Sequence, residues 1–173
     1  MKWLLYSGIG LVALIAVVAT VGWMLPKGHR ASRSVVLTAP PAQVFAIISD
    51  FSRYAEWRSD VTRVEMLPDD GRGLLFREHG KNGAITYRVE ASEPGVRMVT
   101  RIADTNLAFG GSWTYGLTAA TGGATALTIT EDGEVYNPIF RFMSKFVISQ
   151  HATIDAYQAA LKARVETLTS SPR

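Results

Sequence analysis

The sequence predicts an α+β protein in which a curved antiparallel sheet of six to seven strands wraps around one long C-terminal helix. Two short helices follow the first strand, and a single transmembrane helix precedes the domain. Three observations lead to this fold class. An apolar segment occupies residues 3–25, β-prone segments separated by turn residues run from 61 to 135, and a helical pattern of nearly 30 residues follows.

Composition excludes several classes of site. The 173 residues include 18 Lys and Arg against 15 Asp and Glu, and the basic residues do not alternate with aromatics along one element, so no nucleic-acid partner is expected. The chain has no cysteine, which excludes disulfides, thiolate zinc sites and cysteine nucleophiles. Its three histidines are far apart, and no nucleotide-binding glycine loop is present. We therefore expect neither a metal nor a cofactor.

The N-terminal segment is long enough to cross a membrane. Residues 3–25 contain 18 apolar residues, and at 1.5 Å per residue a helix of this length crosses a hydrocarbon core of about 30 Å. Aromatic rings near both ends suit the headgroup layer, and Pro26 ends the helix. A cleaved signal peptide is the alternative, with a weak cleavage site at residues 17–19, but the apolar run continues past it.

This segment sets the predicted organisation of the chain. We expect a membrane anchor at 1–26, a short polar linker at 27–33, one ligand-binding domain at 34–168 and a tail at 169–173. More basic residues follow the apolar run than precede it, so the positive-inside rule places the domain on the cytoplasmic face of a bacterial cell inner membrane, as a single-pass protein. The difference is one or two charges, and a periplasmic domain remains the alternative.

The domain begins with a strand and two short helices. Residues 34–38 are rich in β-branched side chains, and Pro41 is suited to the first turn of a helix that continues to Ser49. Asp50 is then placed to cap a second short helix that ends near Trp57.

Turn residues then divide the chain into six further strands. The expected strands are 61–67, 74–79, 84–91, 96–103, 107–119 and 124–135. Three of them alternate apolar and polar residues, as expected for a sheet with one face on the core and one in water. Asn137 and Pro138 form a capping pair that opens the last helix, which we expect to run unbroken to about Leu168.

This order of elements resembles the helix-grip superfamily, which includes START lipid-transfer domains, Bet v 1-like proteins and polyketide cyclases/dehydrases. Three pieces carry the resemblance: the run Val35-Val36-Leu37-Thr38-Ala39-Pro40 with Gln43-Val44-Phe45, the stretch Asp50-Phe51-Ser52-Arg53-Tyr54-Ala55-Glu56-Trp57, and Asn137-Pro138. The resemblance covers about residues 33–168. It implies a deep apolar cavity between the sheet and the long helix, and it does not settle function.

Candidate ligand-binding residues follow from the faces expected to meet this cavity. They lie on the second short helix, on the inward faces of the strands, and along the terminal helix. They are Phe51, Tyr54, Trp57, Ile85, Tyr87, Met98, Phe109, Trp113, Tyr115, Leu127, Ile129, Met143, Val147, His151 and Ile154.

Two residues are candidates for acid/base chemistry. Glu131 shares the parity of Leu127 and Ile129, so it points inward unless a bulge resets the strand. His79 stands at a strand end before a turn, where a histidine is commonly solvated.

Three functions follow from these features. The first is membrane-anchored binding, carriage or sensing of a hydrophobic small molecule such as a lipid, quinone, isoprenoid or polyketide. The second is a cyclase, dehydrase or isomerase that uses an in-cavity Glu or His. The third is an interaction module whose cavity is collapsed and whose protein partner the sequence does not name. Residues 139–148 are apolar on more than one face, so they are expected either to pack internally or to touch a membrane near the cavity entrance.

Overall fold

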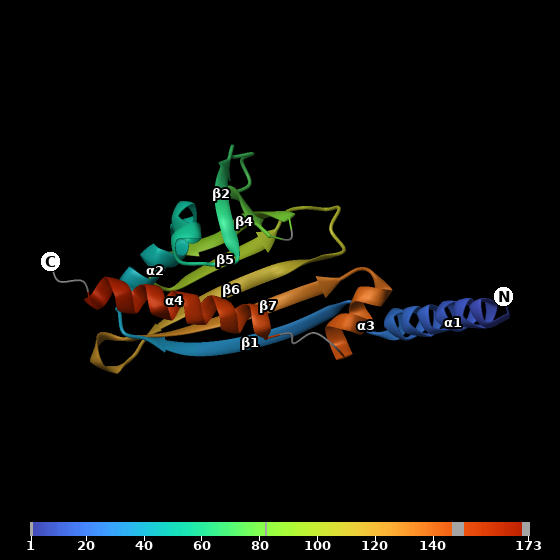
Figure 1. Ribbon diagram of the computed structural model, residues 1–173. Helices are drawn as coiled ribbons and strands as arrows, with labels where there is room; N and C mark the ends of the chain where they lie inside the picture. The colour runs from blue at the N-terminus through green and yellow to red at the C-terminus, as the bar shows by residue number, and fades with distance from the viewer. Residues whose placement is uncertain (1, 82, 147–150, 171–173) are drawn as a thin grey trace.

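The computed structural model describes residues 2–81, 83–146 and 151–170, and it has the predicted α+β fold (Figure 1). The strands are β1 (Gly28–Leu37), β2 (Val61–Leu67), β3 (Leu75–Gly80), β4 (Gly83–Glu93), β5 (Arg97–Ile102), β6 (Phe109–Ala119) and β7 (Thr125–Val135). The helices are α1 (Lys2–Met24), α2 (Pro41–Ser49), α3 (Pro138–Phe146) and α4 (Ala152–Ser170), with short 3-10 helices η1 (Phe51–Glu56) and η2 (Thr121–Gly123).

The seven strands form one antiparallel sheet in the order β1-β7-β6-β5-β4-β3-β2. Strands β2 to β7 each pair with the next strand in the chain, and the last strand, β7, also pairs with the first strand, β1. The α4 helix lies across one face of this sheet (Figure 1). The predicted antiparallel sheet with a helix along it is therefore confirmed.

The first strand begins earlier than predicted. We expected a polar linker at 27–33, but β1 starts at Gly28 and pairs with β7 along its whole length. The polar residues of this segment face water from an edge strand, which explains why they resemble a linker. The residues that join α1 to the sheet are therefore only Leu25, Pro26 and Lys27.

Helix starts follow the predicted signals at two of three places. Pro41 opens α2, and the side-chain oxygen of Asn137 accepts the backbone N–H of Ile139 at 2.9 Å, so it caps α3. The expected cap at Asp50 is wrong, since its carboxylate accepts the hydroxyl of Ser52 and makes no cap bond to the backbone.

The helical pattern after Asn137 forms two helices rather than one unbroken helix. α3 ends at Phe146 and α4 begins at Ala152, and residues 147–150 lie outside the described part. α3 packs beside α1, whereas α4 covers the sheet, so the two helices serve different partners (Figure 1). The α4 side chains Ile154, Leu161 and Val165 are fully buried against the sheet, whereas Met143 of α3 is half-buried.

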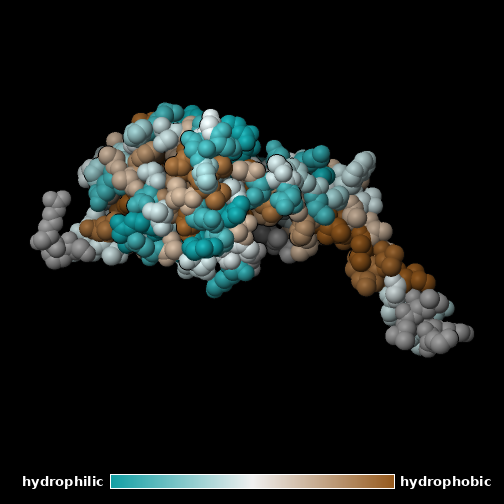
Figure 2. All heavy atoms as spheres, turned by 90° about the horizontal axis from the view of Figure 1, so that it is seen from above, coloured by the Kyte–Doolittle hydropathy of each residue, from teal (hydrophilic) through white to brown (hydrophobic). Residues whose placement is uncertain are grey.

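The α1 helix extends away from the domain. Its segment Tyr6–Met24 is long and apolar enough to cross a membrane, and nearly all of its side chains are exposed. Figure 2 shows these apolar side chains as a stalk beside a largely hydrophilic domain. This exposure is unlike that of a core helix, whose apolar side chains would be covered.

A buried arginine joins the stalk to the domain. Arg141 of α3 donates to the carbonyls of Val135 and Tyr136, both at 2.8 Å, and to those of Gly22 and Leu25, both at 3.4 Å. Gly22 packs so closely on the Pro138 carbonyl that a Cβ there would overlap it. The guanidinium thus satisfies carbonyls at the end of α1, which have no partner within that helix.

Replacing Arg141 should loosen this joint. Arg141→Ala leaves these carbonyls without their charged donor, and we expect a loss of about 3 kcal/mol in the free energy of unfolding. Amide hydrogen exchange of the full chain in detergent should speed up in α3 and leave β4 and β5 unchanged. The matched control is Arg97→Ala, an exposed arginine on β5. Unchanged exchange in α3 would contradict the assignment.

Candidate functional site

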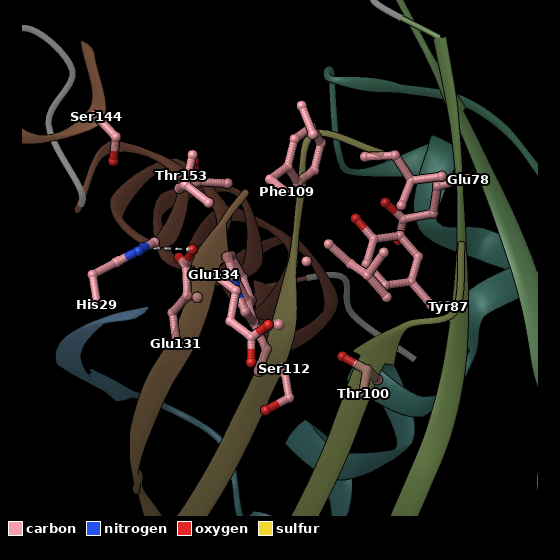
Figure 3. Close-up of a pocket in the computed structure, with 18 of the residues that line it drawn as sticks. His29, Glu78, Tyr87, Thr100, Phe109, Ser112, Glu131, Glu134, Ser144 and Thr153 are labelled. Atoms are coloured by element: carbon pink, nitrogen blue, oxygen red, sulfur yellow. Dashed lines mark ion pairs between the residues drawn. The ribbon is translucent and has the colours of Figure 1, made fainter. Parts of the chain in front are cut away.

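A cavity of about 640 Å³ opens on the inner face of the sheet, beyond the first turn of α4 (Figure 3). Its walls come from every strand except β2, from η1, and from Phe140 and Ser144 of α3. From α4, the described lining includes Thr153 alone. The apolar side chains Ile154, Leu161 and Val165 of this helix are instead packed in the core. The cavity therefore lies at the end of the sheet nearest α1. This open interior contradicts the alternative of a collapsed cavity.

Six of the predicted ligand-binding residues line the cavity. Their side chains come from η1 and from strands β4 and β6. They are Tyr54, Ile85, Tyr87, Phe109, Trp113 and Tyr115. The alternation of apolar residues in β4 and β6 was therefore a reliable guide to the inward face.

The other predicted ligand-binding residues do not line the cavity. Six are packed in the core between the sheet and the helices: Phe51, Trp57, Met98, Leu127, Ile129 and Ile154. Met143 and His151 are half-buried away from the cavity, and Val147 lies outside the described residues. The six core side chains do not reach the cavity because they pack against one another and against α4 in the core.

The closed end of the cavity is built around a buried ion pair. The guanidinium of Arg58 bonds the Glu78 carboxylate at 2.8 Å, and the two side chains are 11% and 12% exposed. Burial raises the pKa of Glu78 and outweighs the opposing effect of Arg58. The Arg58 guanidinium also lies over the rings of Tyr54 and Tyr157 at about 5 Å from each centroid.

Tyrosine hydroxyls add polar groups to this end. Tyr54 donates to the Ile48 carbonyl, and its oxygen lies 3.3 Å from that of Tyr157. Burial raises the pKa of Tyr87 and of Tyr115, so both hydroxyls stay protonated at neutral pH. They can donate to a carbonyl or hydroxyl of a ligand.

The open end carries a second polar pair, on the opposite side of the cavity from Glu78 and Tyr87 (Figure 3). The imidazole of His29 lies 3.4 Å from the carboxylate of Glu131, with side chains 18% and 21% exposed. Glu131 thus points inward, as its strand parity predicts. His29 was not predicted as a site residue, because residues 27–33 were expected to form a polar linker.

Two facing glycines make room for this pair. Gly111 of β6 and Gly133 of β7 are directly paired, and both line the cavity. A Cβ at Gly133 would overlap the His29 imidazole, and Gly111 has a positive φ of 126° that other residues rarely adopt. The absence of side chains here deepens the cavity between Trp113 and Phe109.

His79 lies apart from the cavity. Its imidazole is 3.3 Å from the Glu65 carboxylate on the neighbouring strand, and it does not line the cavity. Along β3, Phe76 and Glu78 point inward, so His79 points to the outer face. The acid/base role considered for His79 is therefore not supported.

Several lining residues were not predicted. They are His29, Arg58, Phe76, Glu78, Thr100, Ile102, Ala108, Gly110, Gly111, Ser112, Gly133, Glu134, Val135, Phe140, Ser144 and Thr153. A signal existed for His29, because the inward alternation of Leu37, Val35 and Ala31 extends back to it. Ile102 likewise shares the parity of Met98 on β5. Within the described residues, no group of three or more His, Asp or Glu side chains is placed to hold a metal ion.

Comparison with known proteins agrees with this architecture. The family model described as polyketide cyclase / dehydrase and lipid transport matches residues 28–168. No curated protein sequence matches the chain.

Solved structures share the fold at low sequence identity. A START superfamily protein from Mycobacterium smegmatis is 21% identical with a TM-score of 0.65, over 81% of this chain and 99% of that one. The Zhui aromatase/cyclase from Streptomyces sp. R1128 is 16% identical with a TM-score of 0.69, over 83% and 97%. Norcoclaurine synthase from Thalictrum flavum is 8% identical with a TM-score of 0.65, over 83% and 97%. At these identities the likeness establishes the fold alone.

The raised pKa of Glu78 predicts a specific pH dependence. A carboxyl whose pKa is higher in the folded state than its ordinary 4.5 favours folding when protonated. We therefore compare the free energy of unfolding of the wild type with that of Glu78→Gln. The wild-type value minus the variant value should fall as pH rises from 4.5 through the raised pKa of Glu78. Chemical denaturation at a series of pH values measures this difference.

The matched control for this experiment is Glu166→Gln, which removes one exposed carboxylate from α4. A difference that rises with pH over the same interval would mean that Arg58 stabilises the Glu78 carboxylate more than burial disfavours it, contrary to our assignment.

Proposed function

Because the chain belongs to the polyketide cyclase / dehydrase and lipid transport family, we propose that it binds a hydrophobic small molecule in the cavity while α1 holds the domain at a membrane. The bound molecule is a lipid, quinone, isoprenoid or polyketide-like compound, and the protein carries or senses it. The observation that carries this proposal is the cavity itself, of about 640 Å³. That volume lies within the range of about 300–1,000 Å³ typical of small-molecule sites.

The distribution of polar groups supports an elongated ligand with polar atoms at its ends. The Arg58–Glu78 pair lies at one end of the cavity, and the His29–Glu131 pair lies at the other. Aromatic and aliphatic side chains line the wall between them. Burial of apolar ligand surface against this wall supplies the driving force, at about 25 cal/mol per Å².

The membrane attachment rests on α1. Its length and exposed apolar surface suit a single crossing of the cell inner membrane. Lys27, Arg30 and Arg33 follow it and favour a cytoplasmic domain, with the periplasmic side as the alternative.

Filling the cavity should abolish ligand retention. Ile102→Trp replaces a side chain of the cavity wall with a larger, aromatic one. The control Val36→Trp introduces the same aromatic side chain at an exposed position of β1. We expect native mass spectrometry of the full chain in detergent to find a bound apolar compound in the wild type and in Val36→Trp. The same compound should be absent from Ile102→Trp. Equal retention in both variants would contradict a ligand in this cavity.

A second candidate function is cyclisation or dehydration, and the His29–Glu131 pair favours it. A carboxylate beside an imidazole in an apolar cavity can take a proton from a CH group next to a ligand carbonyl. The carbanion then attacks a second carbonyl of the same molecule, a C–C bond forms, and the new alkoxide takes up a proton. Loss of that hydroxyl with a neighbouring proton releases water.

The two functions predict different contents of the cavity. If the pair is catalytic, Glu131→Gln and His29→Gln should retain a precursor that is heavier by one water molecule than the compound extracted from the wild type. If the protein only binds its ligand, all three should yield the same compound. Mass spectrometry of solvent extracts distinguishes these outcomes, and Glu90→Gln on the outer part of β4 is the control.

A further inference from the structure

A second, smaller hollow lies where the stalk enters the domain. We call it the junction cleft; its volume is about 220 Å³, and it is lined by residues 25–27 that follow α1, by the start of β1, by the end of β7 and by α3. Four basic residues line it: Lys27, Arg30, Arg141 and Lys145. Its described lining includes no acidic residue. The cleft therefore has the charge and size to receive an anionic group.

Two of these charges are uncompensated. Lys27 and Lys145 are exposed, and within residues 2–81, 83–146 and 151–170 neither makes an ion pair. Arg30 approaches Asp132 at 3.5 Å, but both side chains are largely exposed. Arg141 is engaged by backbone carbonyls and forms the base of the cleft. The two lysines are the groups available to a ligand.

Several other basic residues of the domain are already paired with carboxylates. Arg53 pairs with Glu56, Arg58 with Asp60 and Glu78, and Arg72 with Asp70. These pairs neutralise the side of the domain formed by η1, β2 and the following turn. Lys81 and Lys162 are also exposed and make no ion pair within the described residues, but they line neither hollow. What distinguishes Lys27 and Lys145 is that both line the same cleft.

With α1 across a bilayer, the junction cleft lies at the level of the lipid headgroups. α1 ends at Met24, and its 23 residues span about 35 Å, slightly more than a hydrocarbon core of about 30 Å. With α1 across a bilayer, Lys27 lies at the level of the lipid phosphates. The exposed side chains of Trp23 and Met24 precede it, at the level of the interface.

The junction cleft also adjoins the large cavity. His29, Val135 and Ser144 line both hollows. Phe140 of α3, 54% exposed, lines the cavity on the same helix that carries Lys145. An anionic group in the cleft is therefore held beside the apolar entrance of the cavity.

We propose that the junction cleft binds the phosphate group of an anionic membrane lipid through Lys27 and Lys145, which holds the cavity entrance against the bilayer surface. This proposal rests on the proposed membrane attachment of α1. A free phosphate compound shares the same chemistry, but the adjoining apolar entrance and the exposed rings of Trp23 and Phe140 favour a lipid as its source.

The test compares lipid adducts on the full chain. The protein is held in an uncharged detergent, and native mass spectrometry follows binding of added phosphatidylglycerol or phosphatidylcholine. We expect the wild type to retain phosphatidylglycerol in preference. In Lys27→Gln/Lys145→Gln, affinity for phosphatidylglycerol should fall about 30-fold, since each lysine near an anionic surface contributes about a factor of five.

The chain offers a matched control in Lys81→Gln/Lys162→Gln, which removes two exposed lysines elsewhere and gives the same net charge. This variant should bind phosphatidylglycerol like the wild type. Equal binding of both lipids by the wild type, or equal loss in both double variants, would overturn the proposal. Glycerol phosphate that binds as tightly as phosphatidylglycerol would also overturn it, because the source would then be a free phosphate compound.

The cavity-filling variant separates this proposal from the proposed function. Ile102→Trp alters the large cavity and leaves the junction cleft intact. Loss of the cavity compound with an unchanged preference for phosphatidylglycerol supports both proposals. If the wild type prefers phosphatidylglycerol but retains no cavity compound, the proposed lipid site in the junction cleft is supported and the proposed cavity ligand is contradicted.

Discussion

The buried guanidinium of Arg58 is the interaction on which the cavity depends. It joins Glu78 of β3, Asp60 at the start of β2, and the rings of Tyr54 in η1 and Tyr157 in α4. Because one charge contacts all of these elements, α4 is fixed to the sheet at that end. Removal of one partner would leave an uncompensated charge in the interior, which proteins tolerate poorly. The packed end is thereby closed, and the space left over opens at the other end.

The open end is maintained by missing side chains. The paired glycines at 111 and 133 leave a gap in the sheet face that Trp113 and Phe109 do not fill. The His29 imidazole occupies part of this gap and meets Glu131 there. The cavity therefore has a satisfied ion pair at its closed end and a less buried pair at its entrance. Only the entrance pair is placed where an entering ligand meets it first.

The sequence predicted the sheet and several inward-facing residues, since alternation in β4, β6 and β7 points to Tyr87, Trp113 and Glu131, which all line the cavity. It failed where tertiary contacts decide. The polar first half of the edge strand β1 resembles a linker in sequence, so His29 was not predicted as a lining residue. The continuous period through Met143 and Ile154 gave no sign that α3 and α4 cover different partners. Burial alone also does not separate a lining residue from a packed one, because that depends on how far α4 extends over the sheet.

The short joint between stalk and cavity bears on how the protein exchanges its ligand. Three residues separate α1 from β1, and His29 is the second residue of that strand. Arg141 and the close contact at Gly22 fix α1 against α3, which forms part of the cavity entrance. A domain held in this way would stay within a few residues' reach of the bilayer that we propose α1 crosses. Transfer between two separated membranes requires a long tether, so under the proposed membrane attachment this geometry favours exchange of the ligand with the membrane that holds α1.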